Sequence, residues 1–517
     1  MHLDLSEDWK DPIDQWAHRI DLPMRFVIVA FLLHTIGELG EAYRLYNQAK
    51  EQFEKLGDQP GTAKTVHQLG IIEQRRGNYD EAIKLYAEAR KIFEKLGDES
   101  DTAATLGQLA TIQRDRGNYQ EAKALYNEAK GIFEKHNDQS RIAGVLNNLA
   151  TIEQDTGNYE EAKNLCDQAR GIFEKIGDPS AVARTLGQLS IIEQCRGRYD
   201  DARRLSNQAR ENFEKLQDSS GIAAALHQLA MIEHRRWNYD EASNLYNKSL
   251  QIRQRLGDQS GIANTVGQLA MMERDRGNYD EAKRLYNDSL EIERKLGDQP
   301  GIAKTLHNLA MIEQHKGNYD DARRLYEQSL EIKQKLGNRS GIASTLNQLA
   351  NIEYFKGNHD EAYQLYDQAK AIFEKLGEQS GIAKALHGQA TINQLRGNYD
   401  EASRIYNEAK SIFERLEDQH GVSGVLHNLG VIEQLRPNYD AAEKLFNRAL
   451  EIRRNLGDQP GIAMTLAQLG RVAEEKGDFA LAEKHYQQAL QIFEKLGEKR
   501  YIELAKKDLE RIRQKKH

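Results

Sequence analysis

Cysteine and proline are scarce in this chain of 517 residues, which has two cysteines and seven prolines. The two cysteines, Cys166 and Cys195, cannot form a disulfide framework and suit a reducing compartment. Seven prolines leave few breaks for long helices. Only 39% of the residues are hydrophobic and the mean hydropathy is −0.75, which is too little apolar mass for several thick cores. A thin helical layer with much exposed surface fits this composition better than three or four globular domains.

Long hydrophobic runs and a surplus of positive charge are also missing. The longest apolar run, 26–33, is far too short to span a bilayer. The segment before it carries Asp4, Glu7, Asp8 and Asp11, whereas a secretory signal begins with positive charge. A net charge of −8 disfavours a general nucleic-acid binder, which needs a basic face. We therefore expect a cytoplasmic protein with neither a membrane nor a nucleic-acid partner.

A repeat of 40 residues organises the sequence. The string GNYDEA at 77–82 recurs with little change from residues 117, 157, 277, 317 and 397, and degraded copies begin at 197, 237, 357, 437 and 477. The period is constant over 61–500, which gives eleven repeats, and a degenerate first repeat covers 21–60. Residues 1–20 then form an acidic N-terminal cap segment, and 501–517 form a basic amphipathic helix that caps the last repeat.

Each repeat has the pattern of two helices joined by short turns. In the repeat 301–340, apolar residues recur at helical spacing over 302–312 and again over 319–336. Turns of a few residues require the two helices to be antiparallel. Neither helix is apolar enough to be stable alone, but stacked pairs bury a continuous core. We predict an all-α solenoid of about twelve helix–turn–helix repeats with a C-terminal capping helix.

The helices have recognisable start and stop residues. Asp298 is expected to cap the first helix of its repeat, and Gly317 to end that helix in a left-handed conformation. An asparagine precedes the second helix and often has glutamate three positions later, as in Asn78 and Glu81, which predicts a capping box.

Four positions interrupt the pattern. Trp237 and Pro437 replace the stop glycine, and because both residues resist the left-handed conformation we expect the array to bend or shift there. Cys166 and Ser206 replace the tyrosine of the second helix, which predicts looser packing in two neighbouring repeats.

These residues resemble the tetratricopeptide repeat family. The family pattern is met in one repeat by Leu306, Leu309, Ala310, Gly317, Tyr319, Ala322, Tyr326 and, as serine, Ser329. The 40-residue unit is most similar to the repeats of kinesin light chains and of prokaryotic proteins like them, and the resemblance covers about 21–500. It implies a right-handed superhelix whose first helices line a concave groove for an extended or helical peptide.

One departure from the family pattern is a glutamate where an aromatic residue is frequent. A base three residues later can pair with it. The glutamates are Glu73, Glu153, Glu193, Glu233, Glu273 and Glu313, and the bases include Arg76, Arg196 and Lys316.

The resemblance places positions like 64, 67, 68, 71, 74 and 75 in the groove. The position of Gln68 holds an amide in ten of the eleven full repeats. An amide both donates and accepts, so such a ladder can bond a peptide backbone of any sequence, although it can also simply solvate a helix face. The predicted peptide-binding amides are Gln68, Gln108, Asn148, Gln188, Gln228, Gln268, Asn308, Gln348 and Asn428.

Histidines and aromatic residues extend the predicted groove. A metal site is not predicted from the histidines, because most are two repeats apart and no cysteine or carboxylate completes a set. Tyr354, Phe355, Leu395 and Leu435 form an apolar patch that is either an anchor for the partner or packed on adjacent repeats. The predicted groove residues of this group are His67, His227, His307, His387, His427 and Tyr354.

Bases exceed acids at the six groove positions, by eight to three over 61–460. This excess on an acidic protein favours an acidic ligand or a C-terminal carboxylate, unless it is a chance fluctuation. The predicted basic residues are Lys64, Arg75, Arg114, Arg184, Arg235, Arg274, Lys304 and Lys384.

No phosphate-binding loop, nucleophile elbow or metal motif occurs in the sequence, so we predict neither an enzyme nor a cofactor. The lysine that relatives use to clamp a chaperone's terminal carboxylates is missing from every repeat. The predicted function is a scaffold that binds a protein or peptide partner in its groove. The alternatives are a regulatory or sensor subunit for a separate protease or NTPase, and a structural scaffold that self-assembles through its ends.

Overall fold

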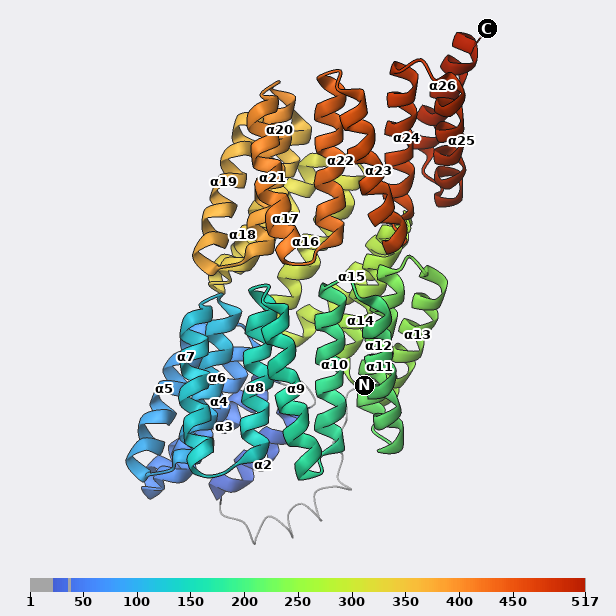
Figure 1. Ribbon diagram of the computed structural model, residues 1–517. Helices are drawn as coiled ribbons and strands as arrows, with labels where there is room; N and C mark the ends of the chain where they lie inside the picture. The colour runs from blue at the N-terminus through green and yellow to red at the C-terminus, as the bar shows by residue number, and fades with distance from the viewer. Residues whose placement is uncertain (1–21, 36–38, 517) are drawn as a thin grey trace. The chain divides into compact units, whose positions relative to one another are not determined.

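The computed structural model describes residues 22–35 and 39–516, and its described part consists of helices and short turns. Residues 1–20, predicted as an acidic cap segment, lie outside the described residues. The predicted all-α architecture of helical pairs is confirmed. Figure 1 shows the two helices of a repeat, such as those labelled α22 and α23, side by side.

The first helix of each repeat is called helix A and the second helix B. The A helices are α4 (Gln59–Arg75), α6 (Glu99–Asp115), α8 (Gln139–Asp155), α10 (Pro179–Cys195), α12 (Ser219–Arg235), α14 (Gln259–Asp275), α16 (Gln299–His315), α18 (Arg339–Lys356), α20 (Gln379–Leu395), α22 (Gln419–Leu435) and α24 (Gln459–Glu475). The B helices are α5 (Tyr79–Leu96), α7 (Tyr119–Lys135), α9 (Tyr159–Ile176), α11 (Tyr199–Lys215), α13 (Tyr239–Leu256), α15 (Tyr279–Leu296), α17 (Tyr319–Lys335), α19 (His359–Leu376), α21 (Tyr399–Arg415), α23 (Tyr439–Leu456) and α25 (Phe479–Leu496). A first pair, α2 (Leu22–Thr35) and α3 (Leu39–Leu56), precedes them, and α26 (Lys499–Lys516) follows.

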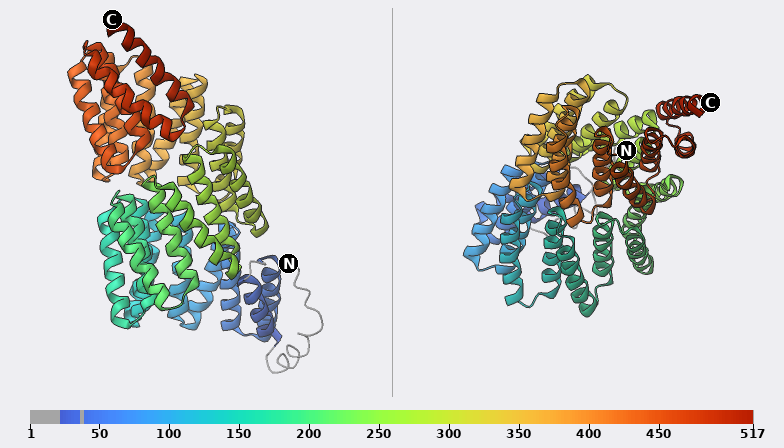
Figure 2. Two further views of the ribbon diagram at one scale, coloured as in Figure 1. Left: turned by 90° about the vertical axis from the view of Figure 1, so that its right-hand side faces the viewer. Right: turned by 45° about the horizontal axis from the view of Figure 1, so that its top comes forward.

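The chain divides into two compact units. The first comprises Met1–Val145, Ile292–Ile302 and Lys335–Gly337, and the second comprises Leu146–Glu291, Ala303–Gln334 and Asn338–His517. Within the first unit α4 packs on α5 and α6 on α7. Within the second unit each A helix from α18 to α24 packs on the B helix that follows it, and α26 packs on α25 (Figure 2).

The core of each repeat is built from small residues of both helices around one large ring. Ala82 and Ala89 are fully buried beside Tyr86, whose ring is also fully buried. A Cβ atom on Gly70 would lie 2.7 Å from the Tyr86 ring, so in this repeat helix A approaches the ring more closely than a side chain allows, whereas Ala110 and Ala310 occupy the same position elsewhere. The fully buried tyrosines at this position are Tyr46, Tyr86, Tyr126, Tyr246, Tyr286, Tyr326, Tyr406 and Tyr486, and Tyr366 is 5% exposed.

The two repeats that have a small residue in place of this tyrosine keep the same helix bounds. Cys166 and Ser206 are fully buried, and burial raises the pKa of the Cys166 thiol to about 12. The Ser206 hydroxyl is hydrogen-bonded to that of Ser190 at 2.7 Å. Ser190 replaces the alanine or glycine of other repeats, so a pair of hydroxyl groups occupies part of the volume that the tyrosine fills elsewhere.

The aspartate caps helix A as predicted, but the asparagine does not cap helix B. Asp298 Oδ1 accepts a hydrogen bond from the Gly301 backbone at 2.9 Å, which confirms the predicted cap. The capping box is wrong, because Asn78 makes no side-chain bond to its own helix. Its Nδ2 donates instead to Glu73 Oε2 at 2.5 Å, back across the turn. The same bond occurs at Asn158, Asn238, Asn278, Asn318, Asn358 and Asn438.

The glutamates that replace the family's aromatic residue are mostly buried and paired. Glu73 bonds Arg76 at 2.7 Å, as predicted. Glu313 bonds Lys283 at 2.7 Å rather than the predicted Lys316. Burial raises the pKa of Glu313, but the hydrogen bonds from Asn318 and Lys283 outweigh it and the pKa lies below its usual value. The acid therefore stays ionised within the core of the repeat.

One ion pair joins successive repeats along the array. The base that follows helix A pairs with an acid in the first turn of the preceding helix B, as Arg116 does with Asp80 at 2.6 Å. Each pair is exposed on its acidic side, so solvent screening keeps its contribution to stability small. The other pairs are Arg196–Glu160, Arg236–Asp200, Arg276–Asp240, Lys316–Asp280, Lys356–Asp320, Arg396–Asp360, Arg436–Asp400 and Lys476–Asp440.

The stop after helix A is left-handed in the described repeats, with φ of 80° at Gly317. Trp237 and Pro437 also have positive φ, 64° and 32°, and the helices around them keep the bounds of other repeats. The expectation that these residues leave the left-handed conformation is therefore wrong, whereas the bend or shift of the array there stays a prediction. Packing on both neighbouring repeats fixes the turn more strongly than the preference of a single residue opposes it.

A positive φ at a residue other than glycine is also found in the turn between helix B and the next helix A, and reciprocal substitutions there test its cost. Gln217 has φ of 56°, and Gly257, at the same place in the next repeat, has φ of 68° and open space where a Cβ atom would lie. We expect Gln217→Gly to raise the free energy of unfolding by about 0.5–1 kcal/mol and Gly257→Gln to lower it by about 1 kcal/mol. Urea unfolding followed by circular dichroism measures both. Equal effects of the same sign would contradict this explanation.

Candidate functional site

One face of each A helix is left uncovered by its neighbours, and it contains the positions predicted for the groove. In α4, Lys64 and Arg75 are exposed and Gln68 and Ile71 are half-buried, whereas Thr65, Val66, Leu69 and Ile72 are buried. The same alternation recurs in the other A helices. We call this surface the helix-A face, and it is the candidate functional site.

In the first unit the helix-A face contains an apolar pocket of about 560 Å³. One wall is α2, which contributes Met24, Val27, Ile28, Phe31 and Leu32. The other walls come from α3 to α6 and include the predicted groove residues Lys64, His67 and Gln68. Met24, Phe31 and Leu32 are each about half exposed, so the pocket is open to a ligand.

Sequence reasoning does not find the α2 side of this pocket, because it takes the run 26–33 only as too short for a membrane span. The available signal is that nearly every residue of α2 is apolar. The faces of α2 that do not contact α3 must therefore also present apolar side chains.

In the second unit the helix-A face contains a more polar pocket of about 340 Å³. Its lining includes three amides of α18, namely Asn347, Gln348 and Asn351, together with Lys384 and His387 of α20. Asn347 is buried, and its side-chain oxygen has no hydrogen-bond partner among the described residues. A ligand that donates a hydrogen bond here would satisfy an acceptor that is otherwise unpaired.

The predicted amide ladder is half-buried, except for Asn148, which is exposed. Some of the amides bond neighbouring helices. Gln188 Nε2 donates to the Asn147 carbonyl and to Thr151 Oγ1, both at 2.8 Å, and Asn428 Nδ2 donates to His387 Nε2 at 2.8 Å. Gln348 Oε1 accepts from Asn351 of its own helix at 3.0 Å. Gln268 Oε1 is buried without a partner among the described atoms. Part of the ladder therefore joins repeats, and part of its hydrogen-bonding capacity remains. The remaining predicted amides, Gln68, Gln108, Gln228 and Asn308, lie at the same position of their helices.

The predicted histidines pack between repeats. We call His67, His227, His307, His387 and His427 the histidine column. Each ring lies 4.9–5.5 Å from the aromatic ring of its own helix B. Burial is the main cause of their low pKa values, which are about 4 for His67, His227 and His387 and about 3 for His307 and His427.

Hydrogen bonds fix the protonation of two members of the column. His67 Nδ1 lies 3.0 Å from Thr105 Oγ1, and His227 Nδ1 lies 3.2 Å from Thr265 Oγ1. Each threonine hydroxyl donates to a backbone carbonyl in its own helix, so it accepts from the histidine. The low pKa keeps both histidines neutral near pH 7, and the hydrogen bond places the proton on Nδ1. Whether the column also touches a peptide stays a prediction.

The predicted basic residues divide into two groups. Arg114 and Arg274 each pair with the next residue, Asp115 and Asp275, at 2.7 Å, so their charge is neutralised locally. The exposed members are Lys64, Arg75, Arg184, Arg235, Lys304 and Lys384.

Of the predicted apolar patch, Tyr354 is half-buried and its ring contacts those of Phe355 and His359. Phe355, Leu395 and Leu435 are exposed at the ends of their helices.

Within the described ranges, no three His, Cys, Asp or Glu side chains gather as a metal site requires. No described helix combines the length and apolar character needed to cross a membrane.

A sequence model described as tetratricopeptide repeat matches most of the chain, at residues 27–95, 62–135, 141–215, 261–335, 341–415 and 422–495. A second model with the same description matches 222–256. The chain belongs to the tetratricopeptide repeat (TPR) family. No curated protein sequence matches it.

Among solved structures, the TPR chain is similar to BtubC (BKLC) from P. vanneervenii, with 24% identity over 44% of this chain and 92% of that one and a TM-score of 0.35. It is also similar to a signal transduction ATPase with numerous domains and a tetratricopeptide repeat sensor from Pyrococcus horikoshii, with 18% identity, 69% and 55% coverage and a TM-score of 0.43. A Rap protein complexed with competence and sporulation factor matches with 13% identity, 77% and 98% coverage and a TM-score of 0.46.

Proposed function

We propose that this TPR protein is a scaffold that holds a peptide segment of a partner protein on its helix-A face. The observation that carries the proposal is the apolar pocket of the first unit, where α2 and the predicted groove residues Lys64, His67 and Gln68 line one cavity. A soluble protein rarely leaves such apolar side chains around a cavity unless they meet a ligand.

The chemistry of the lining indicates the kind of segment. An aliphatic or aromatic side chain fits against Phe31, Met24 and Val27, while Gln68 beside it can bond the peptide backbone. In the second unit the amides around Asn347 offer the same backbone chemistry with a cation, Lys384, nearby. The exposed bases of the helix-A face favour acidic residues around the anchor.

Selection from a random peptide library displayed on phage tests this function with a defined probe. We expect the purified chain to enrich peptides with one large apolar residue flanked by acids. Phe31→Glu is expected to weaken binding of a selected peptide at least about tenfold, because it places a charge in the apolar pocket. Leu504→Glu, an exposed apolar position on α26, is the matched control. Equal binding by wild type and Phe31→Glu would contradict the pocket's role.

A second variant separates the amide ladder from the pocket. Gln228, Gln268 and Asn308 are replaced together by alanine, and a crosslinking pulldown compares the partners recovered. We expect fewer partners, because the variant removes three side chains that bond a backbone without regard to sequence. An unchanged set of partners would show that these amides only join repeats.

A further inference from the structure

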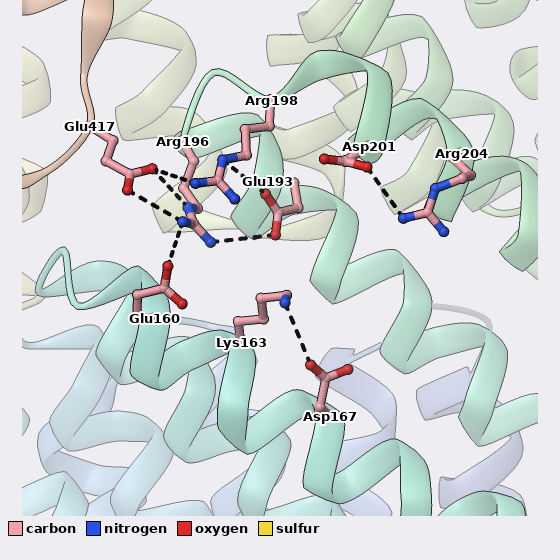
Figure 3. Close-up of polar contacts among 9 residues, drawn as sticks. All are labelled: Glu160, Lys163, Asp167, Glu193, Arg196, Arg198, Asp201, Arg204 and Glu417. Carbon is pink, nitrogen blue, oxygen red and sulfur yellow. Dashed lines mark hydrogen bonds and ion pairs between the residues drawn. The ribbon is translucent and has the colours of Figure 1, made fainter.

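Turns that are far apart in the sequence contact each other within each unit. The turn between helix A and helix B is called the AB turn, and the turn between helix B and the next helix A is called the BA turn. In the second unit Glu417, in a BA turn, accepts hydrogen bonds from Arg196 at 3.2 Å and Arg198 at 3.1 Å, both in an AB turn (Figure 3). Tyr199 OH lies 3.3 Å from His420 Nε2 beside them.

A leucine before the BA turn seats on a glycine of the AB turn. A Cβ atom on Gly157 would lie 2.6 Å from Leu416 Cδ2, and one on Gly77, in the first unit, would lie 2.5 Å from Leu336 Cδ2. Both leucines lie 259 residues after their glycine, and the same spacing relates Leu456 to Gly197. The contact is thus a repeated feature of the array, in which the glycine makes room for the leucine.

In the second unit, some residues at the leucine position have no glycine against them, and some glycines of AB turns have no leucine against them. Ile176, Leu216 and Leu256 occupy the leucine position but are 40–50% exposed. By contrast, the equivalent leucines of later repeats are only 5–8% exposed. Conversely, Gly357 and Gly397 are exposed with nothing near a Cβ atom. The buried leucines used in this comparison are Leu416 and Leu456.

The unpartnered AB turns carry an added apolar surface. Phe355, Leu395 and Leu435 end the helices next to these turns, and each is 51–54% exposed. The position is polar or small where the contact is made within the chain, and apolar at these three successive open turns, whereas the open turns at Gly277, Gly317 and Gly477 have Asp275, His315 and Glu475 there. Phe355 and Leu395 lie beside open glycines and Leu435 lies beside Pro437, and this row of exposed apolar residues is a candidate contact surface. At the same position the partnered repeats have Asp155, Cys195 and Arg235.

We propose that a second copy of this chain docks on these AB turns through its own BA turns. Ile176, Leu216 and Leu256 of one copy seat on Gly357, Gly397 and the apolar residues beside them in the other. The internal contacts argue for this occupant, because the two surfaces already fit each other within one chain. The two surfaces are different, so each bound copy still offers one free surface of each kind and association continues head to tail.

The contact between copies differs from the internal one in its polar part. Asn398 and Gln217 stand where the internal contact has Arg198 and Glu417, so the charged bonds have no counterpart. Association between copies therefore rests on apolar burial, and we expect it to persist at high salt.

Sedimentation velocity of the full chain over about a hundredfold range of concentration tests the proposal. We expect the weight-average mass of the wild type to rise with concentration. Leu395→Glu with Leu435→Glu places charges beside the open AB turns and blocks docking there. Leu216→Glu with Leu256→Glu places charges beside the exposed BA turns and blocks docking through them. Each variant alone is expected to associate at least about tenfold more weakly. Because all four side chains are 40–54% exposed, unfolding midpoints should match the wild type.

Mixing the two variants gives the decisive result. Each retains the surface that the other lacks, so an equimolar mixture is expected to form a dimer that does not grow. Met464→Glu, an exposed apolar residue on the helix-A face, should associate like the wild type. A wild type that stays monomeric throughout, or a mixture that stays monomeric, overturns the proposal. If a variant fails to fold, Leu395→Gln and Leu216→Gln replace it in the same comparison.

Discussion

Lowering the pH from 8 to 5 is expected to destabilise the array by about 1–2 kcal/mol for each member of the histidine column. The folded pKa values are about 4 for His67, His227 and His387 and about 3 for His307 and His427, mainly because the rings are buried. In the unfolded chain, histidine has its ordinary pKa near 6.5. The unfolded chain therefore binds protons that the folded chain does not, and stability falls as the pH falls from about 6.5 towards 4.

Neighbouring charges act in the same direction as burial. Lys333 Nζ lies 3.5 Å from His307 Nδ1, and Arg253 and Arg453 also lower the pKa of His227 and His427. A protonated ring would thus be both desolvated and repelled.

Another repeat of the same protein shows which residue can replace these histidines. Asn147 occupies the position of the column in its own repeat, and its Nδ2 donates to Thr185 Oγ1 at 2.9 Å, as His67 and His227 donate to their threonines. Replacing all five histidines by asparagine is expected to remove most of the loss of stability between pH 6.5 and 5. His136→Asn, at an exposed site, is the control. The free energy of unfolding in urea is measured at each pH. A pH dependence equal to that of the wild type would show that other groups cause the acid sensitivity.

Tyr326→Ser is expected to lower the free energy of unfolding by about 3–5 kcal/mol. The Tyr326 ring is fully buried, packs among Ala310, Ala322 and Ile352, and its hydroxyl donates to Gln314 Oε1 at 3.0 Å. Serine leaves a cavity and a buried hydroxyl without the partner that Ser206 has in its own repeat.

A second substitution tests the explanation. Ser190 and Ser206 form the natural hydroxyl pair, and Ala310 and Tyr326 occupy the corresponding positions. Adding Ala310→Ser to Tyr326→Ser is expected to recover about 1 kcal/mol by restoring that pair. Hydrogen exchange of α16 to α18 measures the local effect, because repeat arrays can unfold in parts. No recovery would show that the cavity alone sets the cost.

The helices and their bounds are predictable because the 40-residue period repeats the same local signals. The aspartate cap of helix A and the left-handed stop are correct for this reason. The capping box fails because Asn78 has a stronger acceptor nearby, the buried carboxylate of Glu73, which the spacing of residues on one helix does not reveal. The expectation that Trp237 and Pro437 avoid the left-handed conformation fails because neighbouring repeats hold these turns in place.

The candidate site is predictable only in part. The positions of Lys64 and Gln68 on an open helix face follow from helical periodicity. The degree of burial of His67 depends on how closely the next repeat approaches, which a single helix does not specify. The contact between Gly157 and Leu416 depends on a small rotation accumulated over many repeats, and no local pattern in the sequence encodes that sum.

The ion pairs between successive repeats bear on how such a chain can change its length. Because Lys356–Asp320 and Arg396–Asp360 link equivalent positions, removing or duplicating one 40-residue unit rejoins surfaces that already fit. Genetic gain or loss of whole units is therefore tolerated by the core. The glycine-to-leucine contacts set a lower limit on the number of repeats. Because their two residues are 259 positions apart, a chain needs more than roughly six 40-residue units to form one. A shortened descendant below that length would keep its fold but lose every contact that holds distant repeats together.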